Sequence, residues 1–120
     1  MTLSGRRFLI IEDEAIIAMM LEDAIEEAGG VVLRCVSTVE EALLAIDAEP
    51  PDAAMLDLQL GHDSALPVAW RLQARGVPYI ICTGFGDPAL PPGLVPRHVL
   101  TKPVEFDALQ AAWQALPPLP

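Results

Sequence analysis

Short apolar runs alternate with segments of helical periodicity along this chain of 120 residues. The clearest runs, at residues 8–11 and 53–56, are apolar at every position and too short for helices. Such runs are typical of strands that are buried on both faces of a parallel sheet. We therefore expect strands at about 7–12, 31–36, 53–57, 77–83 and 98–101, joined mostly by helices.

Helix signals fill most of the gaps between these strands. After the first strand, apolar residues recur at three- and four-residue spacing until Gly29 and Gly30 supply a stop. These residues are Ile16, Ile17, Met20, Leu21, Ala24, Ile25 and Ala28. Ser37 or Thr38 is expected to cap a second helix, and further helices are expected at about 66–75 and 105–116. The fourth connection, residues 87–96, carries four prolines and a glycine, so no regular helix of useful length is expected there.

One domain accounts for residues 1–120, with a proline-rich tail at 117–120. Right-handed crossovers between parallel strands predict a doubly wound α/β fold. Its simplest form is a flavodoxin-like, five-stranded parallel sheet in the order 2-1-3-4-5, with the fourth helix short, irregular or absent.

Composition limits the partners and the location that we expect. The formal net charge of −10, with only seven basic residues, argues against direct binding of nucleic acid or anionic lipid. No apolar run is long enough for a signal peptide or a membrane span. Cys35 and Cys82 each fall within an expected strand, and we interpret both as core thiols of a cytoplasmic protein.

Carboxylates follow two of the expected strands. Glu12 and Asp13 follow the first strand, and Asp57 closes the third. These strands are neighbours in the expected order, so the acids converge at the carboxyl edge of the sheet, where ligands bind in open α/β folds. Close carboxylates repel one another unless a cation neutralises them. We expect Mg²⁺ here, with the backbone carbonyl of Gln59 as a further oxygen ligand.

The last two strands bring a hydroxyl and a cation to the same edge. The fourth strand ends at Thr83, and Lys102 follows the fifth. With Asp57 as nucleophile and Mg²⁺ on the acids, these groups form a set suited to phosphoryl transfer.

The order of these motifs resembles the receiver domain of two-component response regulators, over nearly the whole chain. Glu12 and Asp13 match the family's acidic pair, and Asp57 matches its phosphoacceptor. Thr83 matches the switch hydroxyl, and Lys102 the lysine of a Lys-Pro turn. The resemblance implies a stand-alone regulator that accepts a phosphoryl group from a sensor histidine kinase or a histidine phosphotransfer protein. It would catalyse only its own phosphorylation and dephosphorylation, and would either switch a downstream partner or act as a phosphate sink.

Residues 76–86 resemble the FATGUY branch of single-domain receivers, named for a Phe-Ala-Thr-Gly-aromatic motif. Thr83, Gly84 and the aromatic Phe85 stand, whereas Ile81 and Cys82 replace Phe and Ala. This branch implies a histidine kinase of the HWE or a related type as partner.

The usual receiver has an aromatic residue three places before the lysine, and this chain has Val99 there. Phe85 or the fourth connection is therefore the better candidate for the part that moves on phosphorylation. We expect the partner surface near that connection and the last helix. Its expected members are Leu90, Leu94, Val95 and Trp113. Trp113 is alternatively a core residue, or forms a docking surface with Phe106 and Leu109.

Several residues receive simpler interpretations. Glu14 is expected to serve the helix dipole of the first helix and not the metal. His62 and His98 are expected to be surface histidines, and Trp70 a residue of the core or of a partner face.

Two other functional classes remain open. A pseudo-receiver would bind partners without phosphorylation, although every expected pocket residue is present. A small hydrolase of the haloacid-dehalogenase type would want a second aspartate two residues after Asp57, where Gln59 stands.

Overall fold

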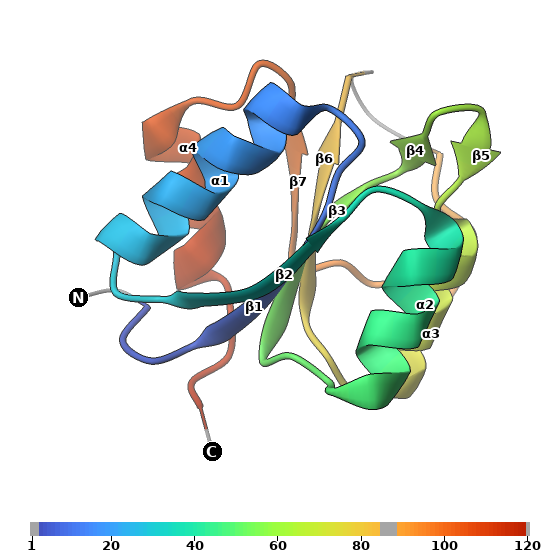
Figure 1. Ribbon diagram of the computed structural model, residues 1–120, viewed down its shortest axis with the longest axis horizontal. Coiled ribbons are helices and arrows are strands. Elements are labelled where there is room, and N and C mark those ends of the chain that lie inside the picture. Colours follow the sequence, from blue (N-terminus) through green and yellow to red (C-terminus); the bar gives the residue numbers. More distant parts are fainter. Residues whose placement is uncertain (1–2, 85–88, 120) are drawn as a thin grey trace.

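The computed structural model of the chain describes residues 3–84 and 89–119. Within these residues the elements are β1 Arg7–Ile11, α1 Ala15–Glu27, β2 Val31–Val36, α2 Val39–Ala48, β3 Ala53–Asp57, β4 Gln59–Leu60, β5 Asp63–Ser64, α3 Leu66–Ala74, β6 Tyr79–Thr83, β7 His98–Thr101 and α4 Phe106–Gln114. The main sheet has five parallel strands in the order β2-β1-β3-β6-β7 (Figure 1). This confirms the expected order, since β6 and β7 are its fourth and fifth strands. No helix in the described part of the chain is both long and apolar enough to cross a bilayer.

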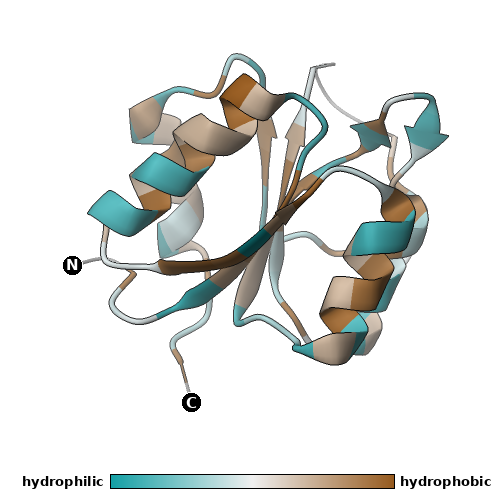
Figure 2. Ribbon diagram, in the orientation of Figure 1, coloured by the Kyte–Doolittle hydropathy of each residue, from teal (hydrophilic) through white to brown (hydrophobic). Residues whose placement is uncertain are grey.

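Alternate residues of the central strands enter two separate cores. Phe8 and Ile10 of β1 belong to the core shared with α1 and α4, whereas Leu9 and Ile11 belong to the core shared with α2 and α3. Figure 1 shows these two helix pairs on opposite faces of the sheet, and Figure 2 shows mainly hydrophobic strands between them. Burial on both faces explains why the strands read as continuous apolar runs.

The helix ends follow the expected signals. Beyond α1, Gly29 has a φ of 94°, a conformation that favours glycine, and Gly30 N–H donates to the carbonyl of Ile25 at 2.9 Å. At the start of α2, Thr38 is the cap: its hydroxyl accepts the N–H of Glu41 at 3.1 Å. The Glu41 carboxylate in turn accepts the N–H of Ser37 at 3.3 Å, so both ends of this turn are satisfied.

The fourth connection has no helix in its described part, residues 89–97, as expected. Gln73 of α3 holds it in place. The Gln73 side-chain oxygen accepts the hydroxyl of Tyr79 at 2.8 Å and the N–H of Val95 at 2.9 Å, while its amide nitrogen donates to the carbonyl of Gly93. Trp70, which is 41% exposed, lies against Gly93. Residues 87 and 88 of the expected connection lie outside the described residues.

Only one of the two cysteines is a core thiol. Cys82 is buried in β6, and burial raises its pKa to about 12. Cys35 is exposed, so its interpretation as a core residue was wrong. The reason is that β2 is the edge strand of the sheet, and its middle residues are only partly covered.

The prediction of a partner surface near the fourth connection and the last helix is also wrong in part, because several of its residues are buried. Trp113, Leu109 and Leu94 are buried, with 3%, 2% and 6% of their surface exposed. The apolar stripe of α4 faces the sheet and is therefore used for packing. Val95 and Phe106 are exposed, and Leu90 is half-buried.

The cap of α2 gives a stability prediction. Replacing Thr38 with Ala removes the acceptor of the Glu41 N–H and should lower the free energy of unfolding by about 1 kcal/mol in urea titrations. Thr38→Ser, which keeps the hydroxyl, should remain within about 0.5 kcal/mol of the wild-type chain. Equal losses in the two variants would contradict the assigned cap.

Candidate functional site

The sheet brings the expected site residues to one edge. Asp57 is the last residue of β3 and Thr83 the last of β6, while Glu12 directly follows β1. The register pairs Ile11 with Leu56, so the strands that carry Glu12 and Asp57 end side by side. After β7, Lys102 N–H donates to the carbonyl of Thr83 at 2.7 Å, which fixes the start of the lysine turn beside β6.

The ammonium group of Lys102 lies at the centre of the site. Its Nζ is 2.9 Å from Oε1 of Glu12, 3.0 Å from Oδ2 of Asp57 and 3.1 Å from Oε1 of Glu14. The side chain of Lys102 is 12% exposed, and those of Glu12 and Asp57 are 1% and 8% exposed. One largely buried cation is therefore shared by three carboxylates.

Backbone groups orient two further carboxylate oxygens. Oδ1 of Asp57 accepts the N–H of Gln59 at 3.1 Å, and Oδ2 of Asp13 accepts the N–H of Gly61 at 2.9 Å. The hydrogen bond from Gly61 is the main reason that the pKa of Asp13 is lowered. Asp13 thus links the β1–α1 turn to the loop that follows Asp57.

That loop contains the hairpin of β4 and β5, which the sequence interpretation missed. The signal was the pair Gly61 and His62 between two short strands, where Gly61 has a φ of 63°. A glycine at the first position of a two-residue turn is a hairpin signal, but each strand has only two residues. His62 is exposed, as expected, and His98 opens β7 half-buried.

Burial and charge shift the pKa values within the site in opposite directions. Desolvation raises the pKa of Glu12 to about 7, in spite of the opposing effect of Lys102. Burial alone would lower the pKa of Lys102, but its hydrogen bonds to Glu12, Asp57 and Glu14 raise it above its ordinary value. Lys102 therefore remains charged, while Glu12 is close to its midpoint at neutral pH.

The donor set fits a hard divalent cation. Glu12, Asp13, Glu14 and Asp57 each offer a carboxylate oxygen, and these oxygens lie within 4.8 Å of one another. Oε1 of Glu12 is buried and accepts no hydrogen bond from the described residues, although it lies 2.9 Å from Lys102 Nζ. Clustered carboxylate oxygens of this kind suit Mg²⁺. A hollow of about 200 Å³ adjoins them. Its lining residues are Asp13, Glu14, Asp57, Gln59, Gly84 and Lys102.

The side chain of Glu14 makes a contact that the sequence did not predict. It occupies the N-cap position of α1, but its side chain makes no capping hydrogen bond. Its carboxylate contacts Lys102, a contact that the expected role at the helix dipole did not include. Glu14 is a member of the acid cluster.

Of the other residues expected to respond to phosphorylation, Thr83 and Val99 are described by the structure. Thr83 is buried, with 4% of its surface exposed, at the end of β6. Val99, at the position of the usual aromatic residue, is half-buried against the core that α2 and α3 cover. The Lys102–Pro103 peptide bond is cis. Phe85 lies outside the described residues.

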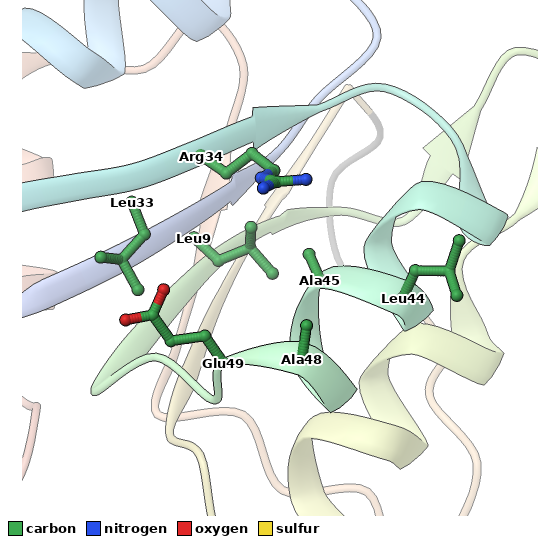
Figure 3. A pocket seen from close by; sticks show the side chains of 7 residues that line it. All are labelled: Leu9, Leu33, Arg34, Leu44, Ala45, Ala48 and Glu49. Atoms are coloured by element: carbon green, nitrogen blue, oxygen red, sulfur yellow. The ribbon is translucent and has the colours of Figure 1, made fainter.

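A second hollow, of about 280 Å³, lies between β2 and α2 (Figure 3). Aliphatic side chains form most of its lining, with Arg34 and Glu49 as the charged members. It shares no residue with the acid cluster. Its lining residues are Leu9, Leu33, Arg34, Leu44, Ala45, Ala48 and Glu49.

The pKa of Glu12 predicts a pH dependence. Between about pH 4.5 and pH 7 the folded chain keeps a proton on Glu12 that the unfolded chain releases. The contribution of Glu12 to the free energy of unfolding should therefore fall as pH rises through this window. The measurement is made in EDTA, which keeps the site free of metal ions. In urea titrations, wild-type stability should decline relative to Glu12→Gln across the window. A constant difference between the two chains would contradict the raised pKa.

Comparisons with known proteins agree with this geometry. The family model of the response regulator receiver domain matches residues 8–114. The acid tolerance regulatory protein ActR of Sinorhizobium medicae is 30% identical over 112 residues, which cover 89% of this chain and 57% of ActR. The chain spans about half the length of the curated relatives that it matches first.

Solved structures show the same fold. SdrG from Sphingomonas melonis Fr1 superposes with a TM-score of 0.80 at 38% identity, covering 97% of this chain and 98% of that one. The response regulator PhyR from Brucella abortus superposes with a TM-score of 0.81 at 30% identity, covering 96% of this chain and 49% of PhyR. The chain therefore belongs to the response regulator receiver domain family.

Proposed function

We propose that the chain accepts a phosphoryl group on Asp57 from a phosphohistidine of a sensor kinase or phosphotransfer protein. The observation that carries this proposal is the Lys102 ammonium 3.0 Å from Asp57 Oδ2, beside a cluster of four acids at the ends of β1 and β3. The hollow beside Asp57 gives the incoming group access to this carboxylate.

The transfer exchanges one bond for another. An oxygen of Asp57 attacks the phosphorus as the P–N bond of the phosphohistidine breaks. The bonding electron pair stays on the imidazole nitrogen, which takes up a proton. Lys102 neutralises charge that develops on the phosphoryl oxygens, and the hydroxyl of Thr83 donates to one of them.

Glu12, Asp13, Asp57 and the backbone carbonyl of Gln59 would hold Mg²⁺. Bound there, the ion supplies positive charge to the phosphoryl oxygens. Two of these acids, Glu12 and Asp57, contact the Lys102 ammonium when no ion is bound. The chemistry proposed is confined to the chain's own phosphorylation and dephosphorylation, and no external substrate is turned over.

The resemblance to FATGUY receivers supports a kinase of the HWE or a related type as the donor. The likeness to SdrG over 98% of that solved chain supports action as a receiver domain. A downstream partner then reads the phosphorylated surface directly. A cytoplasmic location belongs to the same proposal.

The described structure offers a docking surface beside the site. Ile16, Met19 and Met20 of α1 are 83%, 62% and 42% exposed, although Ile16 and Met20 belong to the apolar pattern that predicted the helix. Exposed apolar side chains grouped on one helix mark an interaction surface. Since α1 starts directly after the acid cluster, we assign this surface to the phosphodonor protein.

Phosphorylation is tested by intact mass. After incubation with MgCl₂ and acetyl phosphate, the wild-type chain should gain about 80 Da, the mass of one phosphoryl group. Asp57→Asn should gain nothing, because it has no carboxylate to attack phosphorus. No gain in the wild-type chain, with Mg²⁺ binding shown by calorimetry, would favour the phosphorylation-independent pseudo-receiver instead.

The docking surface is tested by comparing donors. Ile16→Asp should slow phosphotransfer at least about tenfold from the fastest donor in a panel of phosphorylated kinases and phosphotransfer domains. Labelling by acetyl phosphate, which needs no docking, should change less than about twofold. Leu44→Asp is the matched control, because Leu44 is 72% exposed on α2, away from the site. Equal slowing by both variants would contradict the assignment to α1.

A further inference from the structure

Glu14 is the one acid of the cluster to which the mechanism above gives no task. Its Oε1 lies 3.1 Å from Lys102 Nζ, and its side chain is 59% exposed. The other two partners of this ammonium, Glu12 and Asp57, are buried. Lys102 thus has two partners on the inner side of the site and one on the solvent side.

The inner contacts of Lys102 conflict with binding of a divalent cation. The ammonium lies 2.9 Å from one oxygen of Glu12, 3.1 Å from the other, and 3.0 Å from Oδ2 of Asp57. These carboxylates belong to the group whose oxygens lie within 4.8 Å of one another. A cation that binds Glu12, or Asp57 through Oδ2, therefore competes with the ammonium for the same oxygens. The ammonium then needs another anion near by, since its side chain is largely buried.

Glu14 is placed to be that anion. Its backbone N–H donates to Oε2 of Glu12 at 3.2 Å, which fixes the start of α1 against the acid pair. Its carboxylate makes no hydrogen bond that caps α1. It therefore remains available to Lys102 when the inner oxygens are taken.

We propose that Glu14 is a positioning residue that draws the Lys102 ammonium outward and so frees oxygens of Glu12 and Asp57 for Mg²⁺. Lys102 then stays beside Asp57, in reach of a phosphoryl group. This second consequence rests on the proposed function, whereas the effect on Mg²⁺ binding does not.

A simpler role for Glu14 gives a different result. Its negative charge alone, among three other carboxylates, would strengthen Mg²⁺ binding without any contribution from Lys102. The two roles are separated by removing the ammonium. If Glu14 acts through Lys102, its effect must disappear in a chain that lacks the ammonium.

The test is a double-mutant cycle read by calorimetric titration with MgCl₂. Glu14→Gln should weaken Mg²⁺ binding about three- to fivefold in the wild-type background, the size expected from an exposed ion pair. In a Lys102→Met background the same change should matter less than about 1.5-fold. Glu27→Gln, which removes the same charge at the far end of α1, should have no effect in either background.

Thermal unfolding of every variant shows that each chain is folded, and Lys102→Gln replaces Lys102→Met if the latter does not fold. Equal losses in both backgrounds would overturn the role through Lys102, as would no loss in the wild-type background or a wild-type chain that binds no Mg²⁺. A chain that follows the expected cycle but gains no phosphoryl mass would refute the proposed function and leave the role of Glu14 standing.

Discussion

A single ammonium group shared by three carboxylates is the interaction around which the site is organised. Glu12 and Asp57 are buried at the ends of adjacent strands, where burying a carboxylate without a partner is costly. Lys102 supplies a positive charge from the turn after β7, with its Nζ between 2.9 and 3.1 Å from all three acids. The charge balance is still incomplete, because the cluster holds four carboxylates. The residual negative charge is what a divalent cation would neutralise.

The parallel sheet makes this arrangement possible and limits how it can respond. Strands buried on both faces fix the ends from which the acids, Thr83 and Lys102 project. A phosphoryl group on Asp57 would compete with the carboxylates for Lys102 and would therefore change the turn after β7. Gln73 holds residues 93–95 against α3 through two hydrogen bonds, and a third joins it to Tyr79, so the described part of the fourth connection is anchored to α3. Rearrangement on phosphorylation must work against that anchor.

Much of the fold follows from local sequence. The five main strands, their order and the lack of a fourth-connection helix in residues 89–97 were predictable, because short apolar runs and prolines determine them locally. The convergence of Glu12, Asp57 and Lys102 followed from that order. The errors concern exposure and long-range contact. Cys35 is exposed because β2 is an edge strand, and the apolar pattern of an edge strand does not distinguish it from a central strand. Trp113 shows that an apolar stripe identifies a buried face but not whether the sheet or a partner covers it. The contact of Glu14 with Lys102 joins residues 88 positions apart, and no local signal reports it.

A crystal structure of the chain with Mg²⁺ and beryllofluoride, an analogue of the phosphoryl group, tests whether Asp57 is the phosphoacceptor and Lys102 its charge partner. We expect beryllium bonded to a carboxylate oxygen of Asp57, Mg²⁺ on the acid cluster, and Lys102 Nζ moved from Asp57 Oδ2 to a fluorine atom. The Thr83 hydroxyl should donate to a second fluorine atom. Mg²⁺ on the acids with no beryllofluoride on Asp57, or Lys102 still bound to Asp57 Oδ2 beneath the analogue, would show that the site does not receive a phosphoryl group in this way.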